Sequence, residues 1–238
     1  MSDNLNGFRL FHSAETPSTN DQAKEFARAN PSMQAVFLAD QQIGGRGRSG
    51  NSWISPVGNL YMSVLLPCNI NIRHAGQYSF LAAVATHRAL STKIGPQDTL
   101  KLKWPNDLLL NDRKLSGILL ETAADGTQLK NLIIGIGVNI LHAPEYAASL
   151  PVKTTPMEAA GMILDEIVRL DRDFQAFGFE PIRQEWLSYS KGLGQVIQVR
   201  LPQQTLQGAF AGLDENGCLI LEQDNKTLTI ASGDVFFE

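Results

Sequence analysis

The chain has 238 residues, of which 43% are apolar, and this length is sufficient for one good-sized domain plus a small one. Its formal net charge of −4, from 20 Lys and Arg against 24 Asp and Glu, gives no general electrostatic reason to bind nucleic acid or an anionic membrane. The two cysteines, Cys68 and Cys218, are too few and too far apart for a disulfide framework or a zinc ribbon, and we interpret them as reduced thiols.

The N-terminal segment does not have the pattern of a targeting signal. Residues 1–10 lack a basic start followed by an apolar run, and no later segment approaches the roughly 20 apolar residues that a membrane span requires. These features predict a cytoplasmic protein. The first strand is then predicted at residues 8–12.

Three segments predict helices. The run STND, Ser18–Asp21, is typical of a capping box, and it predicts a helix that continues to about residue 29. Residues 73–93 repeat apolar side chains at steps of three and four, and predict a second helix that packs through one face. The third helix begins at TPME, Thr155–Glu158, a capping box with proline at the first helical position. Its apolar stripe consists of Leu164, Ile167, Leu170, Phe174 and Phe177.

The strand-like segments fall into two groups. The first group, at residues 34–40, 59–66, 100–104, 115–122 and 131–140, alternates with the helices and indicates one sheet with helices on a face. From about Gly194 the strands are closely spaced around the turn Asp214–Gly217, which indicates a small β-barrel of SH3-like size. We therefore expect two domains, residues 1–188 and residues 189–238.

The segment GGRGRSGNSW, residues 44–53, fits two phosphate-binding patterns by spacing. Both the dinucleotide fingerprint and the P-loop require a helix directly afterwards, because the helix N-terminus holds the phosphate. Pro56 and Gly58 break any helix here, and the following residues alternate as in a strand, so both patterns are excluded. What remains is a long loop that carries Arg46 and Arg48 and ends on Trp53. The arginines could bind phosphate or carboxylate oxygens, and the tryptophan could stack on a purine ring. A solvated loop with incidental charges is the alternative.

The stretch Lys101–Glu121 contains further candidates. In an extended run Lys101 and Lys103 share one face and Trp104 lies on the other, which suggests an anion near the lysines. Asn106 and Asp107 follow Pro105 at a predicted turn, where bonding to their own backbone is an equally good explanation.

The run LIIGIGVNI, residues 132–140, has two different faces. Gly135, Gly137 and Asn139 share one of them, and glycines in a strand suggest that something flat approaches the backbone there. Packing against a helix is an equally good explanation. The four histidines have no metal-ligand spacing, so a zinc site is not expected.

Five motifs, taken in order, resemble the biotin protein ligase family. They are STN at 18–20, QQIGGRGRSGNSW at 41–53, KWPND at 103–107, RKLSGIL at 113–119 and GIGVN at 135–139. The resemblance covers nearly the whole chain. It implies an α+β fold, with a mixed sheet of the class II synthetase-like type and a C-terminal SH3-like barrel. It also implies a ligase that forms an amide bond, using ATP and Mg²⁺ to attach biotin to a lysine of the biotin carboxyl carrier protein of acetyl-CoA carboxylase.

The resemblance also assigns roles to residues of this chain. Those implied to bind biotin are Ser18, Thr19, Asn20, Gln42, Gly45, Arg46, Gly47, Arg48, Lys114 and Gly117. Those implied to contact ATP or the adenylate are Arg46, Arg48, Trp53, Lys103, Asn106, Asp107 and Asn139, with Asp107 also implied as a magnesium ligand. Arg48 and Lys114 are the expected catalytic cations. The family commonly has an arginine where this chain has Asn51, so one expected cation is missing.

Several expectations and alternatives accompany this interpretation. Because the first predicted strand begins near residue 8, no DNA-binding domain is expected before it, and neither nucleic acid nor membrane is an expected partner. A homodimer is left open. The alternatives are a lipoate or octanoate ligase or transferase of the same fold, a ligand-binding module without turnover, and, least supported by the acidic charge balance, a DNA-binding regulator.

Overall fold

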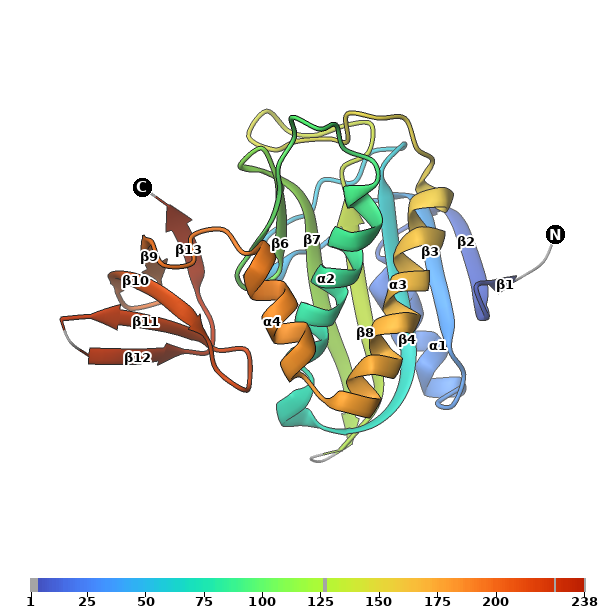
Figure 1. The fold of residues 1–238 in the computed structure, drawn as a ribbon. Helices are drawn as coiled ribbons and strands as arrows, with labels where there is room; N and C mark the ends of the chain where they lie inside the picture. The colour runs from blue at the N-terminus through green and yellow to red at the C-terminus, as the bar shows by residue number, and fades with distance from the viewer. Residues whose placement is uncertain (1–3, 126–127, 225, 238) are drawn as a thin grey trace.

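An eight-stranded mixed sheet forms the larger part of the molecule (Figure 1). The computed structural model describes residues 4–125, 128–224 and 226–237. In spatial order the strands are β1 (Asn4–Leu5), β2 (Phe8–Thr16), β3 (Ala35–Gln42), β4 (Leu60–Asn71), β8 (Gln128–Val138), β7 (Arg113–Asp125), β6 (Asp107–Leu110) and β5 (Leu100–Lys103). The β2–β3 pair is parallel and the other neighbouring pairs are antiparallel, which confirms the mixed sheet.

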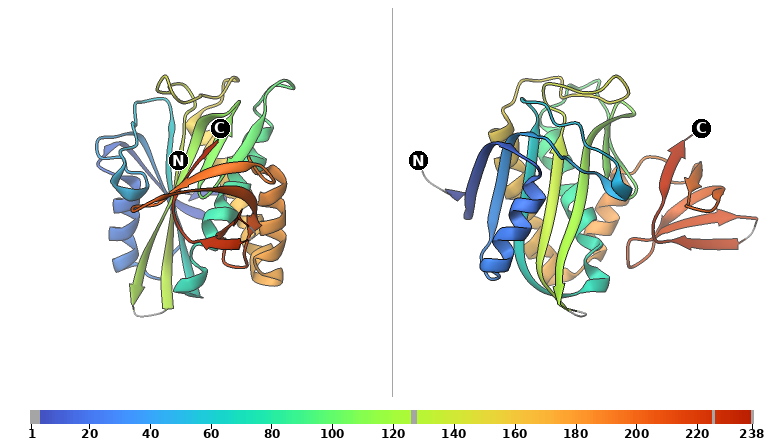
Figure 2. Two further views of the ribbon diagram at one scale, coloured as in Figure 1. Left: turned by 90° about the vertical axis from the view of Figure 1, so that its left-hand side faces the viewer. Right: turned by 180° about the vertical axis from the view of Figure 1, so that it is seen from behind.

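Helices lie on both faces of this sheet (Figures 1 and 2). Three of them, α2 (Gln77–Ser91), α3 (Pro156–Phe177) and α4 (Glu180–Tyr189), lie on one face as expected. The first helix, α1 (Thr19–Ala29), packs on the opposite face, which the expectation of helices on one face did not include. There Ala23 and Ala27 are buried in a cluster with Phe37 of β3, Leu65 of β4 and Ile133 of β8. Small residues on α1 let the helix approach the strands closely, and its N-terminus therefore lies directly over the sheet.

The helix ends differ from each other in how they are capped. In α3 the predicted capping box is confirmed, because Thr155 and Glu158 satisfy each other's backbone N–H groups. The capping box predicted at Ser18 is wrong: its side chain makes no capping hydrogen bond, and Asp21 pairs with Arg46 instead. At the other end of α3 the predicted apolar stripe stops early, since Phe177 is 72% exposed.

The second helix is shorter and more buried than predicted. It begins at Gln77, after a short 3₁₀ turn at Ile72–His74, rather than at residue 73. The expectation that it packs through one face is wrong, because Leu81, Val84 and even Thr86 are fully buried. Its small side chains allow the sheet, α3 and α4 to surround it, so that α2 is the central helix of the main hydrophobic core.

A separate five-stranded antiparallel sheet forms the C-terminal part, as the resemblance implied (Figure 2). In spatial order its strands are β12 (Lys226–Ile230), β11 (Leu219–Gln223), β10 (Thr205–Leu213), β9 (Val196–Arg200) and β13 (Asp234–Phe237). The predicted turn is confirmed, with Asp214 accepting from the backbone N–H groups of Asn216 and Cys218. We propose that the boundary between the two domains lies at 188/189, where α4 ends.

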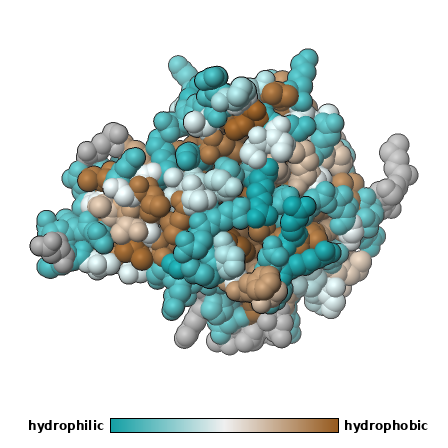
Figure 3. Space-filling model, in the orientation of Figure 1, coloured by the Kyte–Doolittle hydropathy of each residue, from teal (hydrophilic) through white to brown (hydrophobic). Residues whose placement is uncertain are grey.

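The surface over α3 and α4 is mixed in character. Hydrophilic residues cover much of it and apolar residues form separate patches (Figure 3). Among the described residues, no helix is both long enough and apolar enough to cross a membrane.

Candidate active site

A cavity on the α1 side of the large sheet gathers most of the predicted site residues. Its walls are the N-terminus of α1, the glycine-rich loop after β3, the first residues of β4 and β6, the first half of β7 and the last residues of β8. The predicted residues that line it are Ser18, Thr19, Asn20, Gln42, Arg46, Gly47, Arg48, Trp53, Asn106, Asp107, Lys114 and Gly117. Gly135 and Gly137 line it as well, so residues from all five motifs meet at one place.

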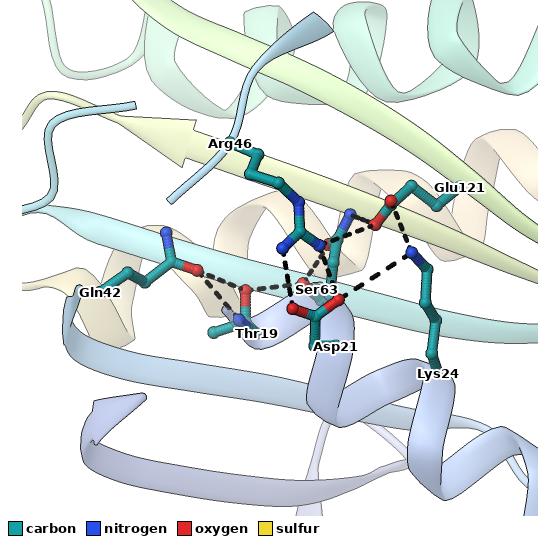
Figure 4. Close-up of polar contacts among 8 residues, drawn as sticks. Thr19, Asp21, Lys24, Gln42, Arg46, Ser63 and Glu121 are labelled. Carbon is teal, nitrogen blue, oxygen red and sulfur yellow. Dashed lines mark hydrogen bonds and ion pairs between the residues drawn. The ribbon is translucent and has the colours of Figure 1, made fainter. Parts of the chain in front are cut away.

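A buried hydrogen-bonded network forms one wall (Figure 4). The Gln42 Oε1 atom accepts from both the backbone N–H and the hydroxyl of Thr19, at 2.9 and 3.2 Å. Ser63 on β4 is fully buried and connects Thr19 to Asn20, with its Oγ atom 2.7 Å from Thr19 Oγ1 and 2.5 Å from Asn20 Oδ1. These contacts fix the orientation of the small polar groups in this wall.

Charged side chains continue this network toward the surface (Figure 4). Glu121 on β7 accepts from Asn20 Nδ2 at 2.7 Å and from Lys24 Nζ at 2.6 Å. Arg46 of the loop binds Asp21 through two hydrogen bonds of 2.8 and 2.6 Å. The Arg46 guanidinium lowers the pKa of the Asp21 carboxyl, and the same pairing raises the pKa of Arg46. Both groups therefore remain charged at neutral pH.

Trp53 lies flat against glycines of the sheet. A Cβ atom added at Gly137 would lie 2.6 Å from Trp53 Cε2, and one added at Gly117 would lie 3.1 Å from Trp53 Cζ3. A Cβ at Gly135 would lie 2.5 Å from Asn20 Oδ1 instead. Both explanations of the strand glycines are therefore correct, one at each position: Gly137 admits a flat ring and Gly135 admits a side chain of α1.

Two cations approach the open part of the cavity. Lys114 Nζ lies 2.7 Å from Asp107 Oδ1 and 5.3 Å from the centroid of the Trp53 ring. Arg48 Nη1 donates to Asn106 Oδ1 at 3.5 Å, a long bond that leaves most of the guanidinium available. The position that lacks the family's arginine, Asn51, also lines the cavity. Arg48 and Lys114 thus form the positive part of the site that an anion would meet.

Three predicted site residues do not line the cavity. Gly45 packs at the base of the loop, where its carbonyl accepts from the Trp53 N–H at 3.0 Å. Lys103 lies over the Phe236 ring at 5.6 Å, and burial lowers the pKa of its amine. Asn139 donates to the carbonyls of Lys114 and Ala148, so it supports the strand that carries Lys114. The contacts of these three residues are therefore with neighbouring residues and not with the cavity.

Sequence reasoning missed several residues of the site. Ser63 and Glu121 enter through strand pairing, which joins β4 to β8 and β8 to β7, and no short motif could have located them. Tyr61 lines the cavity beside Gly137, and burial raises the pKa of its phenol to about 12. Asp234 reaches the cavity from β13 of the C-terminal sheet, a strand that was not predicted.

The side chains that could coordinate a metal ion determine whether the predicted magnesium site fits this structure. Among residues 4–125, 128–224 and 226–237, no group of three or more His, Cys, Asp or Glu side chains is arranged to hold a metal ion. Two carboxylates line the cavity, Asp107 and Asp234, and Asp107 is already paired with Lys114. This arrangement fits Mg²⁺ only in the way nucleotide enzymes commonly hold it, through one carboxylate and the substrate phosphates.

Comparison with known proteins identifies the family of this chain. Residues 13–139 match the Biotin/lipoate A/B protein ligase family, and residues 192–238 match the Biotin protein ligase C terminal domain. The chain is 36% identical over 237 residues to the biotin–[acetyl-CoA-carboxylase] ligase of Paracoccus denitrificans, covering 94% of this chain and 98% of that protein. It is 33% identical over 242 residues to the bifunctional ligase/repressor BirA of Bacillus subtilis, covering 96% and 74%.

A solved structure shows the same fold. The biotin protein ligase from Aquifex aeolicus in complex with biotin and ATP superposes with a TM-score of 0.80 at 27% identity, covering 95% of this chain and 97% of that one. The chain therefore belongs to the biotin/lipoate A/B protein ligase family and, because it also carries their C-terminal domain, to the biotin protein ligases within that family.

Proposed function

We propose that this cavity carries out both steps of ATP-dependent biotin ligation, with Arg48 and Lys114 as the catalytic cations. The protein is a ligase that activates biotin with ATP. The observation that carries the residue assignment is that these two cations line one cavity together with Thr19, Asn20 and Gln42. Hydrogen bonds through Ser63 and Gln42 hold those three side chains in place. A carboxylate extending from a ring held by the network would meet the cations.

In the first step, a biotin carboxylate oxygen attacks the α-phosphorus of ATP. An O–P bond forms, the bond to the β-phosphate oxygen breaks, and pyrophosphate leaves with biotinyl-5′-AMP remaining. Negative charge increases around the α-phosphate in the transition state, and fixed cations in a partly buried site stabilise such charge most strongly. Lys114 and Arg48 line the cavity and would balance this negative charge with their positive charges. Trp53 would stack its ring on the adenine.

In the second step, the neutral amine of an acceptor lysine attacks the acyl carbon of the adenylate. An amide bond forms, AMP leaves with the bonding electron pair, and the amine loses a proton. No enzyme nucleophile is required, so the protein's task is to hold the adenylate and keep water away from it. Where Mg²⁺ accompanies ATP, Asp107 is its proposed ligand, and the ion would supply further charge neutralisation at the phosphates.

The acceptor is proposed to be the biotin carboxyl carrier protein of acetyl-CoA carboxylase, as the name of the Paracoccus relative suggests. The test is to incubate the protein with Mg·ATP, the carrier domain, and biotin, lipoate or octanoate in parallel. Biotinylation of one carrier lysine is expected, and acylation by lipoate or octanoate alone would refute the assignment. The homodimer and the cytoplasmic location stay predictions.

Arg48→Ala is expected to make biotinyl-5′-AMP but to release it at least tenfold faster, because a charge-assisted hydrogen bond contributes about 1.5–3 kcal/mol. The release rate of pre-formed adenylate is measured by rapid filtration. Arg172→Ala, on the exposed side of α3, is the matched control and should retain adenylate as the parent does. Retention by Arg48→Ala as tight as in the parent would contradict the role given to Arg48.

Biotin together with ATP is expected to protect the loop from trypsin at Arg46 and Arg48, because bound phosphate should hold the Arg48 side of the loop in place. Cleavage is followed by mass spectrometry of the fragments. Cleavage after Lys153, exposed in the segment before α3, should not change and provides the internal reference. Equal loop cleavage with and without both substrates would rule out ligand-dependent ordering.

A further inference from the structure

The two arginines of the glycine-rich loop have different surroundings. Arg48 makes one long hydrogen bond to Asn106, whereas the Arg46 guanidinium is fully engaged by the Asp21 carboxylate in a two-bond fork (Figure 4). Such paired bonds are the strongest geometry available to an arginine and a carboxylate. The two side chains therefore have different functions, although the motif presents them as equivalent.

The neighbouring carboxylate does not compete for Arg46. Glu121 uses one oxygen for Lys24 Nζ and the other for Asn20 Nδ2, and it lies 3.9 Å from Arg46 Nη2. Lys24 Nζ is in turn 3.9 Å from Asp21 Oδ1. Asp21 is thus the direct partner of Arg46, and the charges around the pair nearly balance.

The loop's backbone makes Arg46 an effective point of attachment. Arg46 and Ser52 form an antiparallel bridge, and Gly47 N–H donates to Asn51 C=O at 2.7 Å. Fixing the Arg46 side chain therefore fixes both arms of the loop's stem. At the tip, a Cβ atom added at Gly50 would meet nothing within 4 Å, and Ser49 has a positive φ, so the tip gains little support from packing.

We propose that Asp21 is a positioning residue that tethers the glycine-rich loop over the cavity before any ligand binds, and that Arg46 is the tether rather than a phosphate ligand. The tether connects the loop to the same helix turn that presents Thr19 and Asn20. The site thus has a pre-ordered stem and leaves only the Arg48 side to order on the adenylate. The tether itself is a property of the ligand-free protein, and its kinetic consequence rests on the proposed function.

The first test measures the ligand-free protein. Trypsin cleavage after Arg48 should be about threefold to fivefold faster in Asp21→Asn than in the parent, as expected for losing a partly exposed ion pair. Glu25→Gln is the matched control, because Glu25 is exposed on the same helix and its substitution removes the same charge without touching Arg46. It should cleave at the parent rate, and thermal melting of both variants checks that α1 remains folded.

The second test exchanges the partners. Asp21→Arg and Arg46→Asp should each speed cleavage after Arg48, and the double variant D21R/R46D should return it to within twofold of the parent. A merely structural role of either residue predicts that the two effects add. Parent-like cleavage of Asp21→Asn, or additive effects in the exchange, would overturn the tether.

The third measurement concerns catalysis. Asp21→Asn should raise KM for biotin about threefold to fivefold and leave kcat of adenylate formation within twofold, because it changes loop order and not the charge at phosphorus. A fall in kcat at unchanged KM would make Arg46 a transition-state group and overturn the proposal. The proteolysis experiments contain no substrate, so they give the same answer even if the protein ligates something other than biotin.

Discussion

Lys114→Met is expected to lower the rate of biotinyl-5′-AMP formation by about 10²–10³-fold, the usual loss when one fixed group that stabilises transition-state charge is removed. Lys114 is the cation beside Trp53 and Asp107, in the cavity where we propose that the carboxylate and the α-phosphate meet. Because the interaction strengthens as charge develops on phosphorus, kcat should fall more than biotin binding weakens. Single-turnover pyrophosphate release measures this directly.

The controls for Lys114→Met address charge and folding. Lys101→Met removes an exposed lysine of β5 and should leave the rate unchanged. Lys114→Met also leaves the Asp107 carboxylate without its cation, which alone can disturb a site. The double variant D107N/K114M removes that unpaired charge and is still expected to be slow. Recovery of the parent rate in the double variant, or a loss below fivefold in Lys114→Met, would contradict a catalytic role for this lysine.

Gly137→Ala and Gly135→Ala are expected to damage different substrates, although the two residues are neighbours on one face of β8. A Cβ at Gly137 would meet the Trp53 ring at 2.6 Å, so the ring must leave its position and KM for ATP should rise about tenfold or more. A Cβ at Gly135 would meet Asn20 Oδ1 at 2.5 Å, so KM for biotin should rise instead. Steady-state kinetics with the other substrate saturating separates the two.

The matched control for this pair is Gly76→Ala, since nothing lies within 4 Å of a Cβ at that position. It should leave both KM values unchanged. Alanine normally stabilises a strand relative to glycine, so a lower melting temperature in either β8 variant would itself report the clash. Equal effects of both β8 variants on both substrates would contradict the division of the cavity into a Trp53 side and an Asn20 side.

The sequence predicted the elements that depend on local patterns. The capping box at Thr155 satisfies its own helix end within four residues, and the Asp214 turn closes on its own backbone, so both could be read without tertiary information. The motif at Ser18 has the same spacing as the first, but a distant residue, Arg46, takes the carboxylate of Asp21. Tertiary contacts thus decided between two patterns that look alike in sequence.

The sequence predicted those residues of the candidate site that belong to short motifs of the family. The strand glycines indicated a close approach at Gly135 and Gly137, yet only the packing of α1 and of the loop on the sheet shows that one receives Asn20 and the other Trp53. Ser63 and Glu121 have no signature of their own, because their importance comes from hydrogen bonds to Thr19 and Asn20, which are distant in the sequence. Lys103 and Asn139 illustrate the opposite case, since residues of family motifs support the site here from outside the cavity.

The position of Trp53 gives the protein an intrinsic optical reporter. Of its three tryptophans, Trp104 and Trp186 are 3% and 1% exposed in the core, whereas Trp53 lies at the base of the loop with an ammonium group 5.3 Å from its ring. The emission of an indole depends on nearby charge and on contact with solvent, and Trp53 is the tryptophan that the loop itself carries. Fluorescence of the unlabelled enzyme can therefore time the opening and closing of the loop during a single catalytic cycle.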